Sequence, residues 1–386
     1  MYDFDKVIDR RGTCSIKYDL LKEVFGKKDI LPMWVADMDF KSPPCIINAV
    51  RKVCDHGVFG YSFKPDSSTE AFMNWVSERY NWKVKKEWIS SSPGVVAAIP
   101  LSIRCFTNPG DKILIQTPVY PPFHSAVKDC KRELVCSDLK EENGVYSVDW
   151  DDFEEKLKGG VKMFILCNSH NPIGRVWSRE ELTKMGELCL KYGVVIFSDE
   201  IHSDLALFGN RHTVMASISE EISSITVTAM APSKTFNIAG MMNSVIVISS
   251  VDMLRCYGKE LSILHLDLGN LFSHITMDAA YRLGGVWLDA LKAYLEKNID
   301  FTYDYIRSDI PSVKLVKPEG SFLMWLDFRE SGFSHEEVKK RLIEICDLGL
   351  NDGISFGASG RGFFRMNVGA PLSVVQEGLS RLKRAF

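Results

Sequence analysis

The feature that most constrains the fold is a regular alternation, from residue 94 onward, of apolar strand-like runs with helix-like segments. The runs MFIL at 163–166 and VVIF at 194–197 are apolar at every position. Strands with this character are buried on both faces, because helices cover both sides of a parallel sheet. Strands and helices that alternate along the chain therefore predict an α/β fold with a largely parallel sheet.

Local signals place individual elements within this alternation. Ser178-x-x-Glu181 is a capping box that predicts the start of a helix, and Gly193 predicts its end. Pro43 and Gly57 bracket another helix in the same way. Helices are expected over 43–56, 69–80, 95–106, 121–130 and 179–192, and strands over 112–116, 134–136, 162–167, 194–198, 225–230 and 244–249.

Composition changes after about residue 285, which indicates a second unit. A long helix is expected over 287–309, followed by strands at 322–328 and 363–367 and helices at 335–348 and 374–386. These patterns predict a large central α/β domain and a smaller C-terminal α+β domain. At roughly 150 residues per domain, 386 residues have room for two to three domains. The periodicity does not place the first 45 residues in either unit.

Charge and composition exclude several classes of protein. With 47 Lys and Arg against 50 Asp and Glu, the net charge of −3 gives no overall attraction to nucleic acid or an anionic membrane. Apolar stretches such as 95–100 are far shorter than the roughly 20 residues that span a bilayer, and the first residues lack an apolar signal core. A cytoplasmic protein is therefore expected. None of the ten cysteines forms a C-x-x-C pair, so buried, reduced thiols are expected.

Two charged residues directly follow predicted strands, where open α/β sheets bind their ligands. Lys234 lies in APSKTFN, and a lysine becomes a nucleophile when its surroundings remove its proton. Asp199 follows the run VVIF, where an acid can hold a cationic ring nitrogen. Taken singly, Lys234 is also typical of a surface loop and Asp199 of a turn. His202 is either a ligand or a packed histidine.

Two further segments have the character of ligand-binding loops. Asn171 lies in NSHNPIG after the strand at 162–167, and its amide is expected over the edge of the sheet. The same Asn-Pro pair also marks an ordinary turn. Residues 90–94, SSSPG, open the helix at 95–106, whose first amides form a potential anion site. Most helix N-termini bind no ligand, so each of these signals stays open on its own.

In chain order, these segments carry a family resemblance. A Gly-rich helix start, Tyr120, Asn-Pro-x-Gly at 171–174, Asp199 and the Ser-Lys pair at 233–234 resemble fold-type I pyridoxal 5'-phosphate (PLP) enzymes, the aspartate aminotransferase superfamily of class I/II aminotransferase-like proteins. Within it, the chain resembles the carbon–sulfur β-lyase branch of the cystathionine β-lyase (MalY/PatB) type. The segments that carry this resemblance are FDKVIDRRGT at 4–13, VADMDF at 35–40, HGVFGYS at 56–62, SDEIH at 198–202, APSKTFNIAG at 231–240 and GRGFFRMNVGAP at 360–371.

The resemblance implies an architecture. It implies an α/β fold whose large PLP-binding domain, residues 46–284, holds a mostly parallel seven-stranded sheet between helices. A smaller α+β domain comes from both chain ends, with the N-terminal segment 1–45 joining the C-terminal residues 285–386. A homodimer with shared active sites and a small-molecule amino-acid substrate is implied, with no nucleic-acid, membrane or metal partner.

The resemblance also implies the roles of individual residues. Lys234 is the catalytic residue, which attaches the cofactor PLP covalently and moves the Cα proton. Asp199 pairs with the ring nitrogen and keeps it protonated, and Arg365 binds the substrate α-carboxylate with a fork that lysine cannot match. The other cofactor-binding residues are Val95, Val96 and Ser233 at the phosphate, Tyr120 on the ring face, Asn171 at the phenolic oxygen, His202, and Tyr61 from the neighbouring subunit. Ala36, Tyr120 and Asn171 complete the substrate site with Arg365.

Three positions depart from the common aminotransferase pattern. Met242 stands where those enzymes carry a phosphate-binding arginine, His202 replaces a tyrosine, and Ala231 replaces a serine. The lyase branch shares these changes, so they favour a lyase over an aminotransferase. They also leave the phosphate with fewer side-chain partners.

The expected function is a PLP-dependent carbon–sulfur β-lyase that converts cystathionine- or cysteine-type S-conjugates to thiol, pyruvate and ammonia. The first alternative is a PLP-dependent aminotransferase, and the second is a regulatory protein-binding role on the same fold. A metallohydrolase using Asp199, His202, His212 and His170 is disfavoured, because no helical H-x-x-x-H pair is present.

Overall fold

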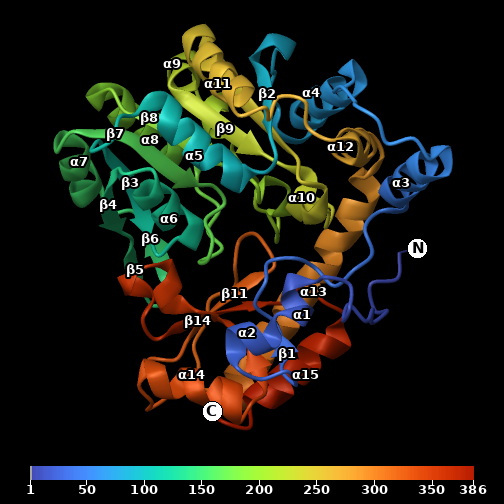
Figure 1. Cartoon of the computed structure of the whole chain (residues 1–386). Helices are drawn as coiled ribbons and strands as arrows, with labels where there is room; N and C mark the ends of the chain where they lie inside the picture. Colours follow the sequence, from blue (N-terminus) through green and yellow to red (C-terminus); the bar gives the residue numbers. More distant parts are fainter. Residues whose placement is uncertain (1) are drawn as a thin grey trace.

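The computed structural model, which describes residues 2–386, is built around a seven-stranded sheet (Figure 1). The strand order is β2-β10-β9-β8-β7-β3-β4, and all strands are parallel except β10, which runs antiparallel to both neighbours. The predicted α/β fold with a mostly parallel seven-stranded sheet is confirmed. The strands are β2 (Ile89–Ser92), β3 (Lys112–Thr117), β4 (Glu133–Asp138), β7 (Val161–Cys167), β8 (Val195–Asp199), β9 (Thr226–Met230) and β10 (Ser244–Ile248).

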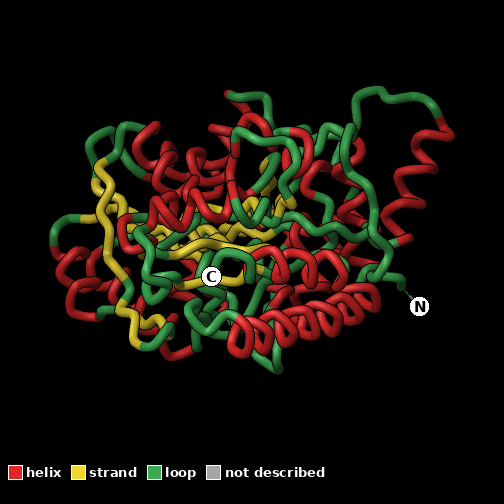
Figure 2. Tube along the Cα trace, turned by 90° about the horizontal axis from the view of Figure 1, so that it is seen from below, coloured by secondary structure: helices red, strands yellow, loops and turns green. Residues whose placement is uncertain are grey.

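Helices cover both faces of this sheet, as the apolar strands require (Figure 2). Along β7, Met163 and Ile165 pack on the face with α5, α6 and α11, whereas Phe164 and Leu166 pack on the face with α7 and α8. The helices of this part are α3 (Pro44–His56), α4 (Asp66–Tyr80), α5 (Val95–Phe106), α6 (Pro121–Asp129), α7 (Trp150–Lys158), α8 (Arg179–Tyr192), α9 (Glu220–Ser224), α10 (Pro232–Thr235), α11 (Val251–Ile263) and α12 (Leu271–Leu283). A hairpin of β5 (Lys140–Glu142) and β6 (Val145–Ser147) and the 3-10 turns η1 (Lys86–Trp88), η2 (Ser203–Leu205), η3 (Met215–Ser217) and η4 (Ala239–Met241) complete it.

The two ends of the chain meet in a smaller unit below the sheet (Figure 1). Leu31 pairs in parallel with Leu348, so strand β1 (Leu31–Pro32) and strand β12 (Leu348–Gly349) join the first and last parts of the sequence. The other elements of these two parts are α1 (Ile16–Asp19), α2 (Leu21–Phe25), α13 (Gly285–Asp309), β11 (Leu323–Asp327), α14 (His335–Glu344), β13 (Asn351–Asp352), η5 (Gly353–Phe356), η6 (Ala358–Gly360), β14 (Phe363–Asn367) and α15 (Leu372–Leu382). The division at residues 45 and 284 stays a prediction, which this pairing supports.

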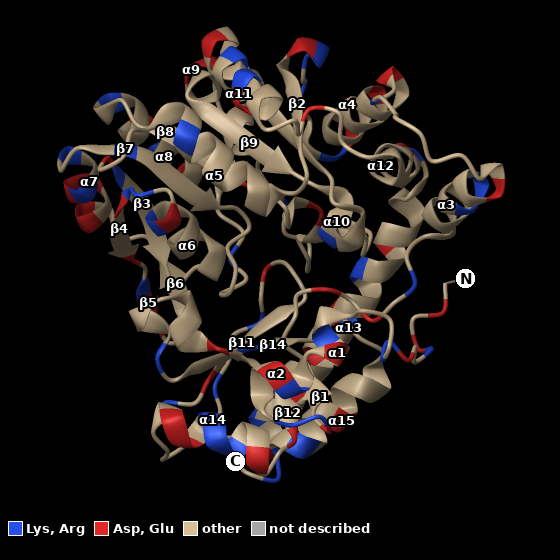
Figure 3. Cartoon of the chain, in the orientation of Figure 1, with Lys and Arg blue, Asp and Glu red and all other residues tan. Residues whose placement is uncertain are grey.

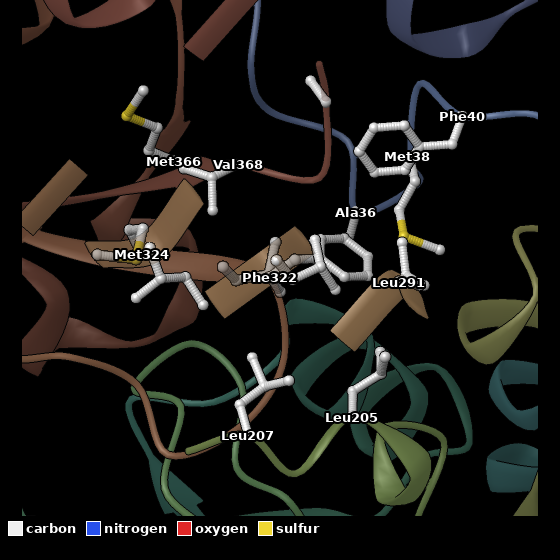
Figure 4. Close-up of a cluster of buried hydrophobic side chains, with 14 of the residues drawn as sticks. Ala36, Met38, Phe40, Leu205, Leu207, Leu291, Phe322, Met324, Met366 and Val368 are labelled. Atoms are coloured by element: carbon white, nitrogen blue, oxygen red, sulfur yellow. The ribbon is translucent and has the colours of Figure 1, made fainter. Parts of the chain in front are cut away.

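A hydrophobic cluster joins the two units (Figure 4). It combines Ala36 and Met38 of the N-terminal segment with Phe322 and Met366 near the C-terminus, and with Leu205 of η2. All five side chains are buried. The small unit is therefore held against the loops that follow the large sheet.

Helix α14 is shorter than the pattern predicts. The apolar spacing predicts a helix over 335–348, but α14 ends at Glu344 and Leu348 lies in β12. Asp347 adopts a left-handed conformation with φ 48°, which interrupts the helix. The prediction extended the helix to residue 348 because Cys346 and Leu348, which are both buried, continue the apolar spacing.

Several other elements were not predicted. Residues 90–92 were assigned only to a helix start, yet they form β2 at the edge of the sheet, with serines in place of an apolar run. Helices α7, α11 and α12 and the β5–β6 hairpin were also missed.

All ten cysteines are free, but Cys14, Cys54, Cys136 and Cys256 are exposed, so the prediction of burial is wrong for these four.

The surface carries charges of both signs. Lys and Arg alternate with Asp and Glu on helices such as α3, α11 and α14 (Figure 3). Among the described residues, no helix is both long enough and apolar enough to cross a membrane.

Candidate active site

A cavity of about 170 Å³ lies at the edge of the large sheet where β7, β8 and β9 end. The carboxyl ends of parallel strands share one edge, so the loops that follow them converge there. The predicted residues that line the cavity are Ala36, Val95, Val96, Tyr120, Asn171, Asp199, His202, Ser233 and Lys234. Residues from six separate segments of the chain thus meet as expected.

Lys234 lies in the one-turn helix α10, directly after β9. Its Nζ donates a hydrogen bond to the backbone oxygen of Ala36 at 2.6 Å. Burial, together with the positive charge of Arg365, lowers the pKa of the Lys234 amine to about 8. A substantial fraction of the amine is then unprotonated near neutral pH, as a nucleophile or general base requires.

Asp199 is the last residue of β8, and its side chain is buried. One carboxylate oxygen accepts a hydrogen bond from the amide of Ile201 at 3.1 Å, and burial raises the pKa of the group to about 7. Asp199 has no ion-pair partner among residues 2–386. The carboxyl group of Asp199 is therefore free to pair with a cationic ligand.

His202 is also buried beside the cavity, and its Nδ1 has no hydrogen-bond partner in the described structure. Burial lowers the pKa of the imidazole to about 3, and the charges of Lys234 and Arg365 act in the same direction. His202 is therefore a neutral ring with one nitrogen free to bind a ligand.

Arg365, on β14, is a buried cation held by neutral partners. Its two terminal nitrogens donate to Asn171 Oδ1 at 2.8 Å, to Asn351 Oδ1 at 2.6 Å and to the oxygen of Trp34 at 3.1 Å. Nε has no partner, and within residues 2–386 no carboxylate pairs with the guanidinium. Burial lowers the pKa of Arg365 to about 10, so it remains charged near neutral pH. A carboxylate ligand would supply the missing counter-charge.

The start of α5 also lines the cavity, through Gly94, Val95 and Val96. The amides of Ala97 and Ala98 both bond to the oxygen of Gly94, whereas the first amides of a helix have no intrahelical partner. Val95 and Val96 therefore present free N–H groups, as an anion site requires. Met242 also lines the cavity, where aminotransferases would place an arginine. That the phosphate has fewer side-chain partners stays a prediction.

The two predicted tyrosines lie in different environments. Tyr120 lines the cavity at the start of α6, and burial raises the pKa of its hydroxyl. Tyr61 does not line the cavity and its side chain is fully exposed. Its own subunit therefore does not bring Tyr61 to the site, which leaves its predicted role with a neighbouring subunit untested.

Three asparagines of the site were not predicted. Asn351 is the second side-chain partner of Arg365, and Asn243 lines the cavity with a buried Oδ1 that has no partner in the described structure. Asn237 bonds through its amide to the backbone of Met38 and Phe40. The left-handed φ of 55° at Asn237 is a conformation that asparagine tolerates, but no spacing in the sequence points to its partners.

The histidines of the metallohydrolase alternative lie in separate places. His212 Nε2 is 2.7 Å from the buried Glu200 carboxylate, and His170 Nε2 is 2.8 Å from the oxygen of Pro118. Among the described residues, no group of three or more His, Cys, Asp or Glu side chains could hold a metal ion.

Comparison with known proteins decides the family. The sequence model of the family described as aminotransferase class I and II matches residues 28–382. The chain belongs to this family. Within it, the chain is 45% identical over 387 residues to cystathionine beta-lyase PatB of Bacillus subtilis, covering 100% of both proteins.

Solved structures of other family members have the same fold. Cystalysin of Treponema denticola, which contains a pyridoxal 5'-phosphate cofactor, is 36% identical with a TM-score of 0.97, covering 100% of this chain and 98% of that one. The PLP-bound C–S lyase of Staphylococcus hominis is 32% identical with a TM-score of 0.93, also covering 100% and 98%. As a family member, the chain shares the whole length and architecture of these proteins.

Proposed function

We propose that this protein is a PLP-dependent carbon–sulfur β-lyase that eliminates thiol from cystathionine- or cysteine-type amino acids. The observation that carries the proposal is that Lys234 and Asp199 line one cavity and Arg365 donates to Asn171 of the same lining, in a chain 45% identical to a cystathionine beta-lyase over its full length. An amine, an unpaired buried acid and an unpaired buried cation are the groups that an amino-acid elimination on PLP needs.

The residues present fit the cofactor. Its phosphate matches the free amides of Val95 and Val96 and the hydroxyl of Ser233, and its cationic ring nitrogen matches Asp199. Burial raises the pKa of the Asp199 carboxyl group to about 7, and a cation beside it would favour its ionised form. Because Arg365 already donates to Asn171 Oδ1, the Asn171 amide nitrogen is left to donate to the phenolic oxygen. Tyr120 and His202 complete the lining around the ring.

When bound, PLP supplies an electron-poor ring that accepts the electron pair left at the substrate Cα. Arg365 would bind the α-carboxylate, with Asn171 and Tyr120 beside it, and so fix the substrate relative to Lys234. Lys234 would attach the cofactor and, once displaced by substrate, take the Cα proton on Nζ. Asp199 would keep the ring nitrogen protonated. Thiolate then leaves from Cβ, and the remaining product hydrolyses to pyruvate and ammonia.

The exposed segment around Tyr61 supports a homodimer with shared sites. Val58, Phe59, Tyr61 and Phe63 are all more than half exposed, which places four large apolar or aromatic side chains on one short loop. A twofold dimer would bury this loop against a partner and bring Tyr61 to the partner's phosphate site. The amino-acid substrate, the dimer and the cytoplasmic location belong to this proposal.

The decisive experiment compares two reactions of the purified protein supplied with PLP. Incubation with cystathionine alone is expected to release pyruvate and thiol, whereas incubation of another amino acid with 2-oxoglutarate is expected to give little glutamate. The Lys234→Ala variant is the matched control and should release no pyruvate. Glutamate formation without pyruvate would instead establish the aminotransferase.

A further inference from the structure

A buried hydrogen-bond cluster outside the cavity is centred on Asp204 in η2. Asp204 Oδ2 accepts from Thr235 Oγ1 at 2.8 Å, and Oδ1 accepts from Trp75 Nε1 at 2.9 Å and from the hydroxyl of Tyr80. None of these residues lines the cavity. One carboxylate therefore joins α4, the loop after β8 and the turn that carries Lys234.

The turn α10 depends on such contacts because it is only four residues long. A single helical turn has no stability of its own, and no side chain caps its start at Ala231. Lys234 and Thr235 are adjacent, so the bond from Thr235 to Asp204 fixes the backbone next to the lysine. Phe236, which packs against Trp75 with ring centroids 5.7 Å apart, holds the next residue.

Asp204 is itself firmly placed relative to Asp199. Its neighbour Leu205 is fully buried in the cluster shown in Figure 4, and the Leu205 amide bonds to the oxygen of His202 at 2.9 Å. Within residues 2–386 Asp204 has no ion-pair partner, and the three neutral donors satisfy both oxygens of its carboxyl group.

We propose that Asp204 is a positioning residue that acts through Thr235 to hold the Lys234 amine at a fixed place relative to Asp199. The catalytic task of Lys234 rests on the proposed function. The hydrogen bonds that position it do not, because they join residues of this chain alone.

Three conservative variants test the proposal. Thr235→Val keeps the shape of the side chain but removes the donor to Asp204, whereas Thr235→Ser keeps the hydroxyl. Tyr80→Phe is the matched control, because it removes a different donor from the same carboxylate on an element that does not carry Lys234, and it keeps the aromatic ring. The unfolding temperature of each variant reports the purely structural loss.

Two measurements report the position of Lys234. In cofactor-free protein, acetylation of Lys234 by acetic anhydride is followed against pH by mass spectrometry, with the exposed Lys6 as internal reference. In the PLP-loaded protein, the rate of cofactor release is followed by absorbance. Neither measurement requires substrate or turnover.

Thr235→Val is expected to move the midpoint of the Lys234 profile upward by about one pH unit, because a loosened turn admits water to the amine. Cofactor release should become at least fivefold faster. Thr235→Ser should resemble the unmodified protein, and Tyr80→Phe should lose thermal stability without moving the profile.

An unmoved profile in Thr235→Val, or equal movement in Tyr80→Phe, would overturn the proposal. A protein that forms no pyruvate from cystathionine yet shows the expected profiles would overturn the proposed function alone.

Discussion

Arg365 is a buried guanidinium that donates hydrogen bonds in three directions and has no acidic partner in the described structure. Arg365→Lys keeps the charge, but a single ammonium cannot both hold Asn171 and Asn351 and present a fork to a carboxylate. A hydrogen bond to a charged group contributes about 1.5–3 kcal/mol, so affinity for the amino-acid substrate should fall at least about tenfold. The KM for cystathionine measures this.

Bound cofactor should be retained in Arg365→Lys, as judged by the absorbance of the purified protein, because Arg365 does not line the cavity itself. Unchanged kinetics on every amino-acid substrate would place the carboxylate site elsewhere.

Replacing Asp199 with asparagine is expected to raise the stability of the cofactor-free protein while it abolishes function. Burial raises the pKa of Asp199 from 3.8 to about 7, so the folded cofactor-free protein disfavours the ionised carboxylate. Below pH 3.8 the carboxyl group is protonated in both the folded and the unfolded protein, and it costs no stability. As pH rises from about 4 to 7, the free energy of unfolding of the cofactor-free protein falls, and above pH 7 this loss is constant. Asp199→Asn removes the charge, and the cofactor-free variant should be more stable by an amount on the order of a few kcal/mol at pH 8.

Urea unfolding of both cofactor-free proteins at pH 4, 6 and 8 tests this. The difference between them should grow with pH and be close to zero at the lowest pH. A difference independent of pH would show that the Asp199 charge is not its source.

Among the elements, α8 and α14 each begin with a capping box. Ser178 and Ser334 accept from the amides of Glu181 and Glu337, and both glutamates return a bond to the cap backbone. Replacing such a cap with alanine costs about 1 kcal/mol. Ser178→Ala and Ser334→Ala should each lower the melting temperature by about one degree, while KM and kcat stay unchanged because neither serine lines the cavity.

The predicted elements are those whose sequence carries a start signal, an end signal or a continuous apolar run. Elements without such a signal were missed. Helix α8 has its box and its closing glycine, and β7 has a continuous apolar run. Strand β2 consists largely of serines at the sheet edge, where one neighbour supplies its bonds, so no periodicity reveals it. The end of α14 depends on the left-handed Asp347, which the apolar spacing does not indicate.

The site residues also differ in whether the sequence alone could predict them. Lys234, Asp199 and Asn171 each lie at or just after the end of a strand of one parallel sheet, so topology predicted that they meet, whereas their roles came only from the family resemblance. Asn351 and Asn237 were not, because their importance depends on contacts with residues 14 and about 200 positions away, respectively. Asp204 was missed for the same reason, since its donors come from α4 and α10.

At the scale of the whole molecule, the proposed dimer predicts that two inactive variants can restore each other. Tyr61→Ala and Lys234→Ala would damage the same site from different subunits. In a mixed dimer, one site receives both changes and the other receives neither. After verified subunit exchange in an equal mixture, activity should recover to about a quarter of the unmodified specific activity. A mixture that remains inactive, or a native protein that sediments as an active monomer, would contradict shared sites.

The segment from Trp34 to Phe40 has a consequence for how the protein is made. Its backbone accepts hydrogen bonds from Lys234, Asn237, Arg365 and Asn367, so residues from the beginning, middle and end of the chain converge on seven consecutive positions. A ribosome has synthesised more than nine-tenths of the protein before Arg365 and Asn367 are added. The nascent chain can form its central sheet early, yet segment 34–40 cannot gain its bonds to Arg365 and Asn367 until β14 has emerged. A chain truncated before residue 365 should therefore hold Ala36 less firmly beside Lys234, and we expect it to retain less PLP than the full chain.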